Sequence, residues 1–183
     1  MHDTHLPRHH EDMSRAMAGL RALMAQPVFT MGDASQIVQL FYALIDLSAQ
    51  HLRTHEQVEF LFALHEHDFR CVMGRMPTNM TLDIDIGLCN AYLNLVTPNE
   101  CGEVQAIATA DQHAYMLECR AYCHNAIGNR PAMIADRHAA SLLRHPLRTQ
   151  VKTFVVQAGT HMAIAYLEAK LATLDSNQRK LSS

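Results

Sequence analysis

The sequence contains no tryptophan and only seven glycines and six prolines among its 183 residues. Glycine and proline supply most turn signals, so their scarcity favours few, long secondary-structure elements. The hydrophobic fraction of 49% and the charged fraction of 18% exclude the composition of a disordered chain. No apolar run approaches the roughly 18 residues that a membrane span needs, and the first residues lack the apolar core of a signal peptide. We therefore expect a cytoplasmic protein that does not associate with membranes.

Short catalytic and cofactor motifs are also missing. The chain has no glycine-rich phosphate loop, no G-x-S-x-G nucleophile turn, no H-E-x-x-H pair and no C-x-x-C pair. A helix-borne di-iron site needs a Glu followed by a His three residues later, and this spacing does not occur either. These absences favour a protein without catalysis and without a cofactor.

The pattern of apolar residues predicts an all-α protein, a bundle of about six or seven helices. Apolar side chains recur at helical spacing in segments that end at Pro27, Gly128 and Pro146. The expected helices cover residues 11–25, 33–52, 54–64, 100–127, 131–145 and 148–174, with Asp33 or Ser35 capping the second and Thr54 with Gln57 forming a capping box in the third. We expect one domain over 11–174, a disordered His-rich tail over 1–10 and a flexible tail over 175–183.

Residues 69–86 allow two interpretations. Leu82 to Ile86 alternates between apolar and acidic residues, as a half-buried strand does, and it could form a small β-hairpin with 69–73. The second interpretation is a loop followed by a helix capped by Thr81. Leu88, Tyr92 and Leu95 continue at helical spacing, which favours the helix.

Thirteen histidines are the main oddity of the composition. The best metal-ligand pattern is His51, His55 and Glu59, because spacings of four place three side chains on one helical stripe. The capping residue Thr54 lies between the first two, and a helix break there would spoil the stripe. The competing interpretation is a solvated face, and on balance we expect no tightly held metal ion.

Two other groups of histidine and cysteine residues are candidates for a metal site. Cys119, Cys123 and His124, with His161 from the last helix, could share a soft ion, but we expect the thiols to pack in the core instead. The run from His65 to Asp68 predicts a polar helix end, because adjacent residues of a helix point in different directions.

Charge is distributed unevenly along the chain. Residues 54–118 contain ten acidic residues against two arginines, a net charge of −8, whereas residues 119–152 have a net charge of +5. The basic segment suggests a surface for an acidic partner, and the expected partner-binding residues are Arg130, Arg137, Arg144, Arg148 and Lys152. The alternative is that the two segments neutralise each other within the fold.

The last expected helix carries apolar residues on more than one flank, which indicates either a central helix or a dimer contact. We expect a homodimer with a contact formed by Ile164, Leu167, Leu171 and Leu174.

These observations predict a regulatory or adaptor protein that binds another protein or a second copy of itself. A DNA-binding regulator is the first alternative, with a helix-turn-helix over 33–64 and a wing over 69–86. Because that region is acidic, nucleic acid should bind only weakly. A metal- or haem-binding helical protein is the second alternative.

Overall fold

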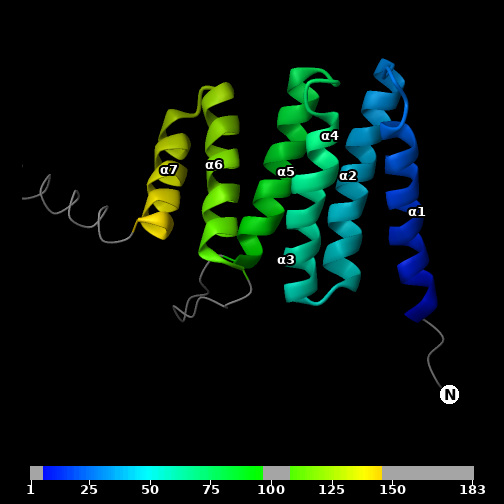
Figure 1. Ribbon diagram of the computed structural model, residues 1–183, viewed down its shortest axis with the longest axis horizontal. Coiled ribbons are helices and arrows are strands. Elements are labelled where there is room, and N and C mark those ends of the chain that lie inside the picture. Colours follow the sequence, from blue (N-terminus) through cyan, green and yellow to red (C-terminus); the bar gives the residue numbers. More distant parts are fainter. Residues whose placement is uncertain (1–5, 97–107, 146–183) are drawn as a thin grey trace, which may run out of the picture. The chain divides into compact units, whose positions relative to one another are not determined.

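The computed structural model describes residues 6–96 and 108–145, and it confirms the all-α class. No strand occurs in these ranges. The elements, which Figure 1 shows, are α1 (Leu6–Met24), α2 (Met31–His51), α3 (Thr54–Ala63), the π-helix η1 (Leu64–Phe69), α4 (Arg70–Val72), α5 (Thr78–Val96), α6 (Ala110–Ala126) and α7 (Arg130–Arg144). By contacts between residues the chain divides into two units, 1–143 and 144–183, and most of the second lies outside the described residues.

Capping residues fix the starts of two helices. Thr30 accepts a hydrogen bond from the Asp33 amide at 3.2 Å, and the Thr30 amide donates to the Asp33 carboxylate at 2.9 Å, so α2 begins with a capping box. Asp33 is therefore the third helical residue, not the cap that the sequence predicted. Thr109 and Gln112 start α6 in the same way.

The chain breaks between α2 and α3, as the sequence predicted. Leu52 and Arg53 are extended, and the helix restarts at Thr54. The residues that serve the new helix end are Arg53 and Glu56, since the Arg53 amide donates to the Glu56 carboxylate at 3.0 Å. The predicted capping box of Thr54 and Gln57 lies one residue too far along the chain, and Gln57 is buried instead.

The hairpin interpretation of residues 69–86 is wrong. Gly74 turns the chain with a positive φ of 75°, and α5 then begins at Thr78, three residues before the predicted cap Thr81. The alternation in this segment misleads because Asp85, which a strand would turn to solvent, lies next to Ile84 in the buried face of the helix.

Helix α5 lies at the centre of the described bundle. It packs against α2, α3, η1 and α6, while α1 packs against α2 (Figure 1). The largest fully buried side chains include Phe41, Leu61, Phe69, Leu88 and Tyr92. Burying such side chains stabilises a fold by roughly 1.5–3 kcal/mol each, so this core holds the helices at fixed positions.

Helix α7 is attached less extensively than the others. It follows Gly128, whose φ of 78° ends α6, and its only buried residues are Asp136 and Ala140. Few buried apolar contacts indicate low local stability. The polar contacts of Asp136 therefore matter more for α7 than ion pairs do for the central helices.

Helix α1 begins at Leu6, so residues 6–10, assigned to a tail by the sequence, are helical. The predicted helix over 148–174 lies outside the described residues, as does the first part of the one predicted over 100–127.

Candidate functional site: a buried histidine, carboxylate and thiol cluster

A π-helix places His65 in the core. The segment Leu64–Phe69 continues α3 with one extra residue in the turn, and it buries Leu64, His65 and Phe69 together. Single π-helical turns inside α-helices occur frequently at functional sites. The wider turn directs His65, only 2% exposed, towards α5. The prediction of a polar helix end over 65–68 is therefore wrong for His65.

Helix α5 supplies the partners of this imidazole. Its residues Asp85 and Cys89 are one turn apart on the buried face, 6% and 0% exposed. His65 Nε2 lies 2.9 Å from Asp85 Oδ1, and Cys89 Sγ donates to the same oxygen at 3.4 Å. The ligand atoms of the three side chains all lie within 4.8 Å of one another.

Helix α6 adds two further thiols. Cys123 is fully buried, and after burial the charge of Asp85 is the largest cause that raises its pKa. Cys119, one turn earlier and half-buried, lies within reach of His65 and of the Tyr115 hydroxyl. Three elements, η1, α5 and α6, thus direct one imidazole, one carboxylate and three thiols into a single region of the core.

Burial and the shared carboxylate shift the pKa values of these groups. Burial by itself would lower the pKa of His65, but hydrogen bonds to Asp85 and Cys119 and the charge of Asp85 outweigh it and raise the pKa to about 9. For Cys89 and Cys123, burial and then the charge of Asp85 raise the pKa above its usual range. In the metal-free protein the cluster is therefore an imidazolium–carboxylate pair beside neutral thiols.

One polar atom of the cluster has no partner among the described residues. His65 Nδ1 is buried without a hydrogen bond, while the ring packs against Phe69 and Tyr115 with centroids 5.2 and 5.6 Å away. Burying an unsatisfied polar atom costs about 1–3 kcal/mol. Because burial of His65 costs free energy in this way, packing alone does not explain why a histidine occupies this position.

The spacing of the cluster suits a tetrahedral ion. Zinc binds nitrogen and oxygen at about 2.0–2.1 Å and sulfur at about 2.3 Å, which separates neighbouring ligand atoms by roughly 3.2–3.8 Å. The separations of 2.9 and 3.4 Å around Asp85 Oδ1 are close to that range. The donor set of imidazole, carboxylate and thiol suits a soft or borderline ion such as Zn²⁺.

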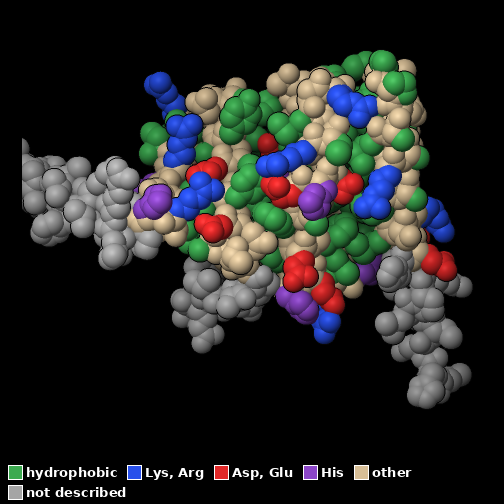
Figure 2. Space-filling model, viewed as in Figure 1, with side chains coloured by type: hydrophobic (Ala, Val, Ile, Leu, Met, Phe, Trp, Pro, Cys, Tyr) green, Lys and Arg blue, Asp and Glu red, His purple; other side chains and the backbone are tan. Residues whose placement is uncertain are grey.

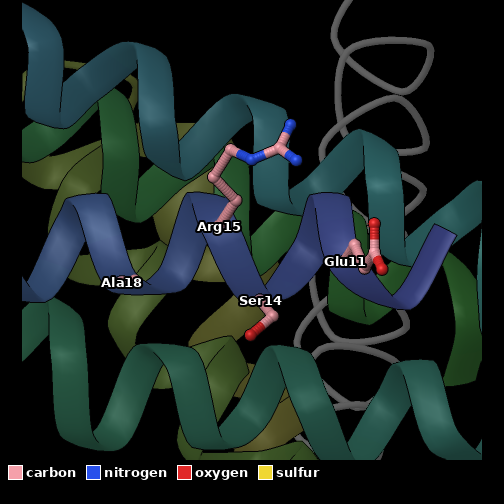
Figure 3. Close-up of a pocket in the computed structure, with 4 residues that line it drawn as sticks. All are labelled: Glu11, Ser14, Arg15 and Ala18. Atoms are coloured by element: carbon pink, nitrogen blue, oxygen red, sulfur yellow. The ribbon is translucent and has the colours of Figure 1, made fainter. Parts of the chain in front are cut away.

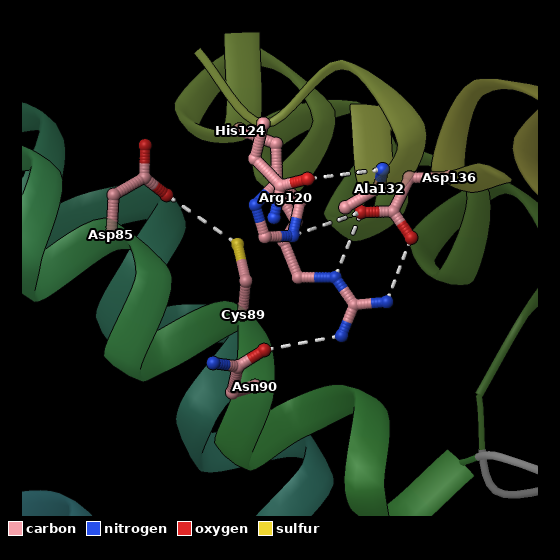
Figure 4. A network of polar contacts seen from close by, with 8 residues as sticks. Asp85, Cys89, Asn90, Arg120, His124, Ala132 and Asp136 are labelled. Atoms are coloured by element: carbon pink, nitrogen blue, oxygen red, sulfur yellow. Dashed lines mark hydrogen bonds and ion pairs between the residues drawn. The ribbon is translucent and has the colours of Figure 1, made fainter. Parts of the chain in front are cut away.

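A second polar network lies directly beside the cluster (Figure 4). The Arg120 guanidinium donates two hydrogen bonds to the Asp136 carboxylate, at 2.9 and 2.7 Å, and a third to Asn90 Oδ1 at 3.1 Å. His124 Nε2 lies 3.7 Å from Asp136. Asp136 is buried, so this bidentate pair joins α6 to α7 through a charge shielded from water.

The structure separates the residues that the sequence predicted as a metal site. His51 is the last residue of α2, whereas His55 and Glu59 are exposed on α3, beyond the helix break. They do not form a group within reach of one ion among the described residues. Of the set Cys119, Cys123 and His124, the two thiols reach the buried cluster, and His124 faces Asp136 instead. His161 lies outside the described residues.

The predicted partner and dimer residues are only partly described. Arg130, Arg137 and Arg144 are exposed on α7, whereas Arg148 and Lys152 lie outside the described residues. All four predicted dimer residues, 164, 167, 171 and 174, also lie outside them.

The sequence analysis missed His65, Asp85 and Cys89 as a site. A usable signal was present, because two helices each carry a pair of ligands four residues apart, Asp85 with Cys89 and Cys119 with Cys123. The histidine could not be found this way, since its orientation depends on the π-helix.

Two surface hollows among the described residues do not compete with this site. The one in Figure 3 is lined by Glu11, Ser14, Arg15 and Ala18, which all belong to α1. One helix face cannot enclose a small molecule, so this depression has the character of ordinary surface. A second hollow lies between α2 and α5 and contains Asp83 as its only charged residue.

Comparison with known proteins found no family model, no curated protein and no solved structure that matches this chain. None of the described helices combines the length and the apolarity needed to cross a membrane.

Proposed function

We propose that the protein binds one soft or borderline metal ion of the Zn²⁺ class in the buried cluster. His65, Asp85, Cys89 and Cys123 would be the ligands, and the half-buried Cys119 would lie beside them. This replaces the expectation of no tightly held metal, which rested on the absence of a cluster in the sequence. The supporting observation is the convergence of His65 Nε2, Asp85 Oδ1 and Cys89 Sγ within 4.8 Å of one another in the core.

The chemistry of the ligands supports this proposal. An ion would bind the thiols as thiolates and the imidazole as a neutral ring, so loading releases protons and replaces a buried ion pair by metal–ligand bonds. Four ligands from the protein close the coordination shell, which is typical of structural rather than catalytic zinc.

Untagged protein purified with zinc should hold one ion per chain in native mass spectrometry. Cobalt loading should produce the absorption bands of thiolate ligation. Cys89→Ser and Cys123→Ser should each lower the affinity for zinc. The loss should exceed the roughly 10- to 100-fold that follows when a group hydrogen-bonded to a metal ligand is removed. Cys71→Ser, which alters an exposed thiol, should leave the affinity unchanged. Folded wild-type protein that takes up no zinc would show that the cluster is only a polar network.

A second candidate is the regulatory or adaptor function, in which the protein binds an acidic partner. Arg130, Ile134 and Arg137 follow at spacings of four and three, so they share one face of α7, and all three are exposed, Ile134 by 61%. Several Arg side chains lie on the α7 side of the face in Figure 2. A basic helix face with a central apolar residue favours contact with an acidic protein segment.

A polyglutamate peptide should therefore bind in a salt-sensitive manner and should lose affinity in the double variant Arg130→Glu, Arg137→Glu. The charge-matched double variant Arg15→Glu, Arg21→Glu on α1 is the control and should retain binding. Fluorescence anisotropy measures both. Duplex DNA that binds more tightly than the peptide at physiological salt would favour the DNA-binding alternative instead.

A further inference from the structure

Every thiol of the buried cluster is followed in the sequence by a residue of the second polar network. Cys89 precedes Asn90 on α5, and on α6 Cys119 precedes Arg120 while Cys123 precedes His124. Consecutive helical residues point about 100° apart, so one face of each helix serves the cluster and the adjacent face serves the network. Figure 4 shows this for Cys89 and Asn90, which leave α5 in different directions.

The network supplies the polar attachment of α7, which also packs Ala139, Ala140 and Leu143 against the core. Asp136 receives the two forked hydrogen bonds of Arg120 and lies near His124, and Arg120 is held in turn by Asn90 of α5. Apart from Asp136, α7 buries only Ala140. A planar guanidinium paired through two bonds tolerates little displacement, because both bonds require one relative orientation of the groups.

We propose that an ion in the buried cluster controls the ordering of α7 through Arg120, His124 and Asp136, so that the protein responds to metal. This inference rests on the proposed metal site. The three ligand atoms of His65, Asp85 and Cys89 are already close together, and the fourth ligand of the proposed site is the buried Cys123 of α6. Bringing Cys123 onto the ion fixes α6 against α5, and the adjacent Arg120 and His124 are fixed with it.

The direction of the effect follows from this arrangement. With metal bound, α6 cannot shift along α5, so Arg120 keeps the orientation that binds both Asp136 and Asn90. Without metal, α6 has only packing and hydrogen bonds to hold it, and the pair with Asp136 forms and breaks with the movements of α6. Metal therefore stabilises α7, whose outer face carries Arg130, Ile134 and Arg137, without touching it.

Hydrogen–deuterium exchange of the whole chain, with and without equimolar zinc, tests this mechanism. We expect zinc to slow exchange of the α7 amides by about tenfold, the effect of securing one charge-assisted interaction. In Asp136→Asn and in Asn90→Ala, zinc should still bind with one ion per chain, but the zinc-dependent slowing in α7 should disappear. Glu56→Gln, which alters an exposed ion pair at the start of α3, is the control and should retain the zinc-dependent slowing of α7 exchange.

Two variants are needed because Asp136→Asn removes the contact itself and can leave α7 open in both states. Asn90→Ala leaves the pair of Arg120 and Asp136 in place, so α7 should exchange as fast as in the metal-free wild type and lose only its response to zinc. If the network were merely structural, each variant would speed exchange equally with and without zinc. Zinc that binds and leaves α7 exchange unchanged in the wild type would overturn this inference and leave the metal site standing. Absence of zinc binding would overturn both.

Discussion

Replacing Asp85 by alanine should lower the free energy of unfolding of the metal-free protein by about 3–5 kcal/mol. The carboxylate is the common partner of the cluster, since it pairs with His65 at 2.9 Å and accepts the hydrogen bond of Cys89 at 3.4 Å. Its removal leaves a buried imidazolium without a counter-charge, and the Cys89 thiol loses its acceptor. Breaking a buried pair from one side is far more damaging than losing an exposed one.

Urea denaturation in the presence of a chelator measures this effect. Asp46→Ala is the control, because Asp46 is an exposed carboxylate on α2 and its loss should change stability by less than about 0.5 kcal/mol. The isosteric Asp85→Asn, which keeps the shape and one acceptor, should fall between the two. An Asp85→Ala protein as stable as the Asp46→Ala protein would contradict the charged pair.

Local signals allowed much of the helical framework to be predicted. Apolar periodicity identified α2 and α3 together with the break near Thr54, and Gly128 was recognised as the end of α6 because a left-handed residue stops a helix there. Caps were less accurate. The backbone amides at the two helix starts are capped by Thr30 with Asp33 and by Arg53 with Glu56. Residues of similar type lie next to them in the sequence, and side-chain type alone cannot decide between positions one residue apart.

The candidate site depends on tertiary structure, which explains why it was missed. Asp85 appeared as the polar half of an alternating strand, and only packing against η1 and α6 makes a carboxylate acceptable in that buried face. His65 belongs to four consecutive polar residues, of which the π-helix buries this one and leaves His67 exposed. Cys119 and Cys123 were recognised as a ligand pair because both lie on one helix. Their partners lie 30 or more positions away along the chain, where spacing carries no information.

The metal-free and zinc-loaded proteins should respond oppositely to pH between about 6.5 and 8.5. Without metal, the pKa of His65 is raised in the folded state to about 9 from its ordinary value of 6.5. A raised pKa contributes stability that is fully present below the unfolded value and is lost as pH rises through the folded value. The contribution of the imidazolium–carboxylate pair, on the order of 3 kcal/mol, should therefore decline across this window.

Other groups near the cluster act outside the window. Burial and the charge of Arg120 lower the pKa of His113. The contribution of His113 to stability therefore changes only below the ordinary pKa of histidine, and there it increases with pH. The thiols of Cys89 and Cys123 have a raised pKa, and they weaken the metal-free fold only at still higher pH. Neither effect reproduces a decline between pH 6.5 and 8.5.

Zinc should reverse this slope. Ligation requires neutral imidazole and thiolates, so protons compete with the ion and the stabilisation by zinc grows as pH rises. Urea denaturation at several pH values, with chelator and with excess zinc, should give two curves that diverge above pH 7. His65→Gln should flatten the metal-free curve, whereas His138→Gln, an exposed position on α7, should leave both unchanged. Parallel curves with and without zinc would mean that the ion does not bind through His65 and its neighbouring thiols.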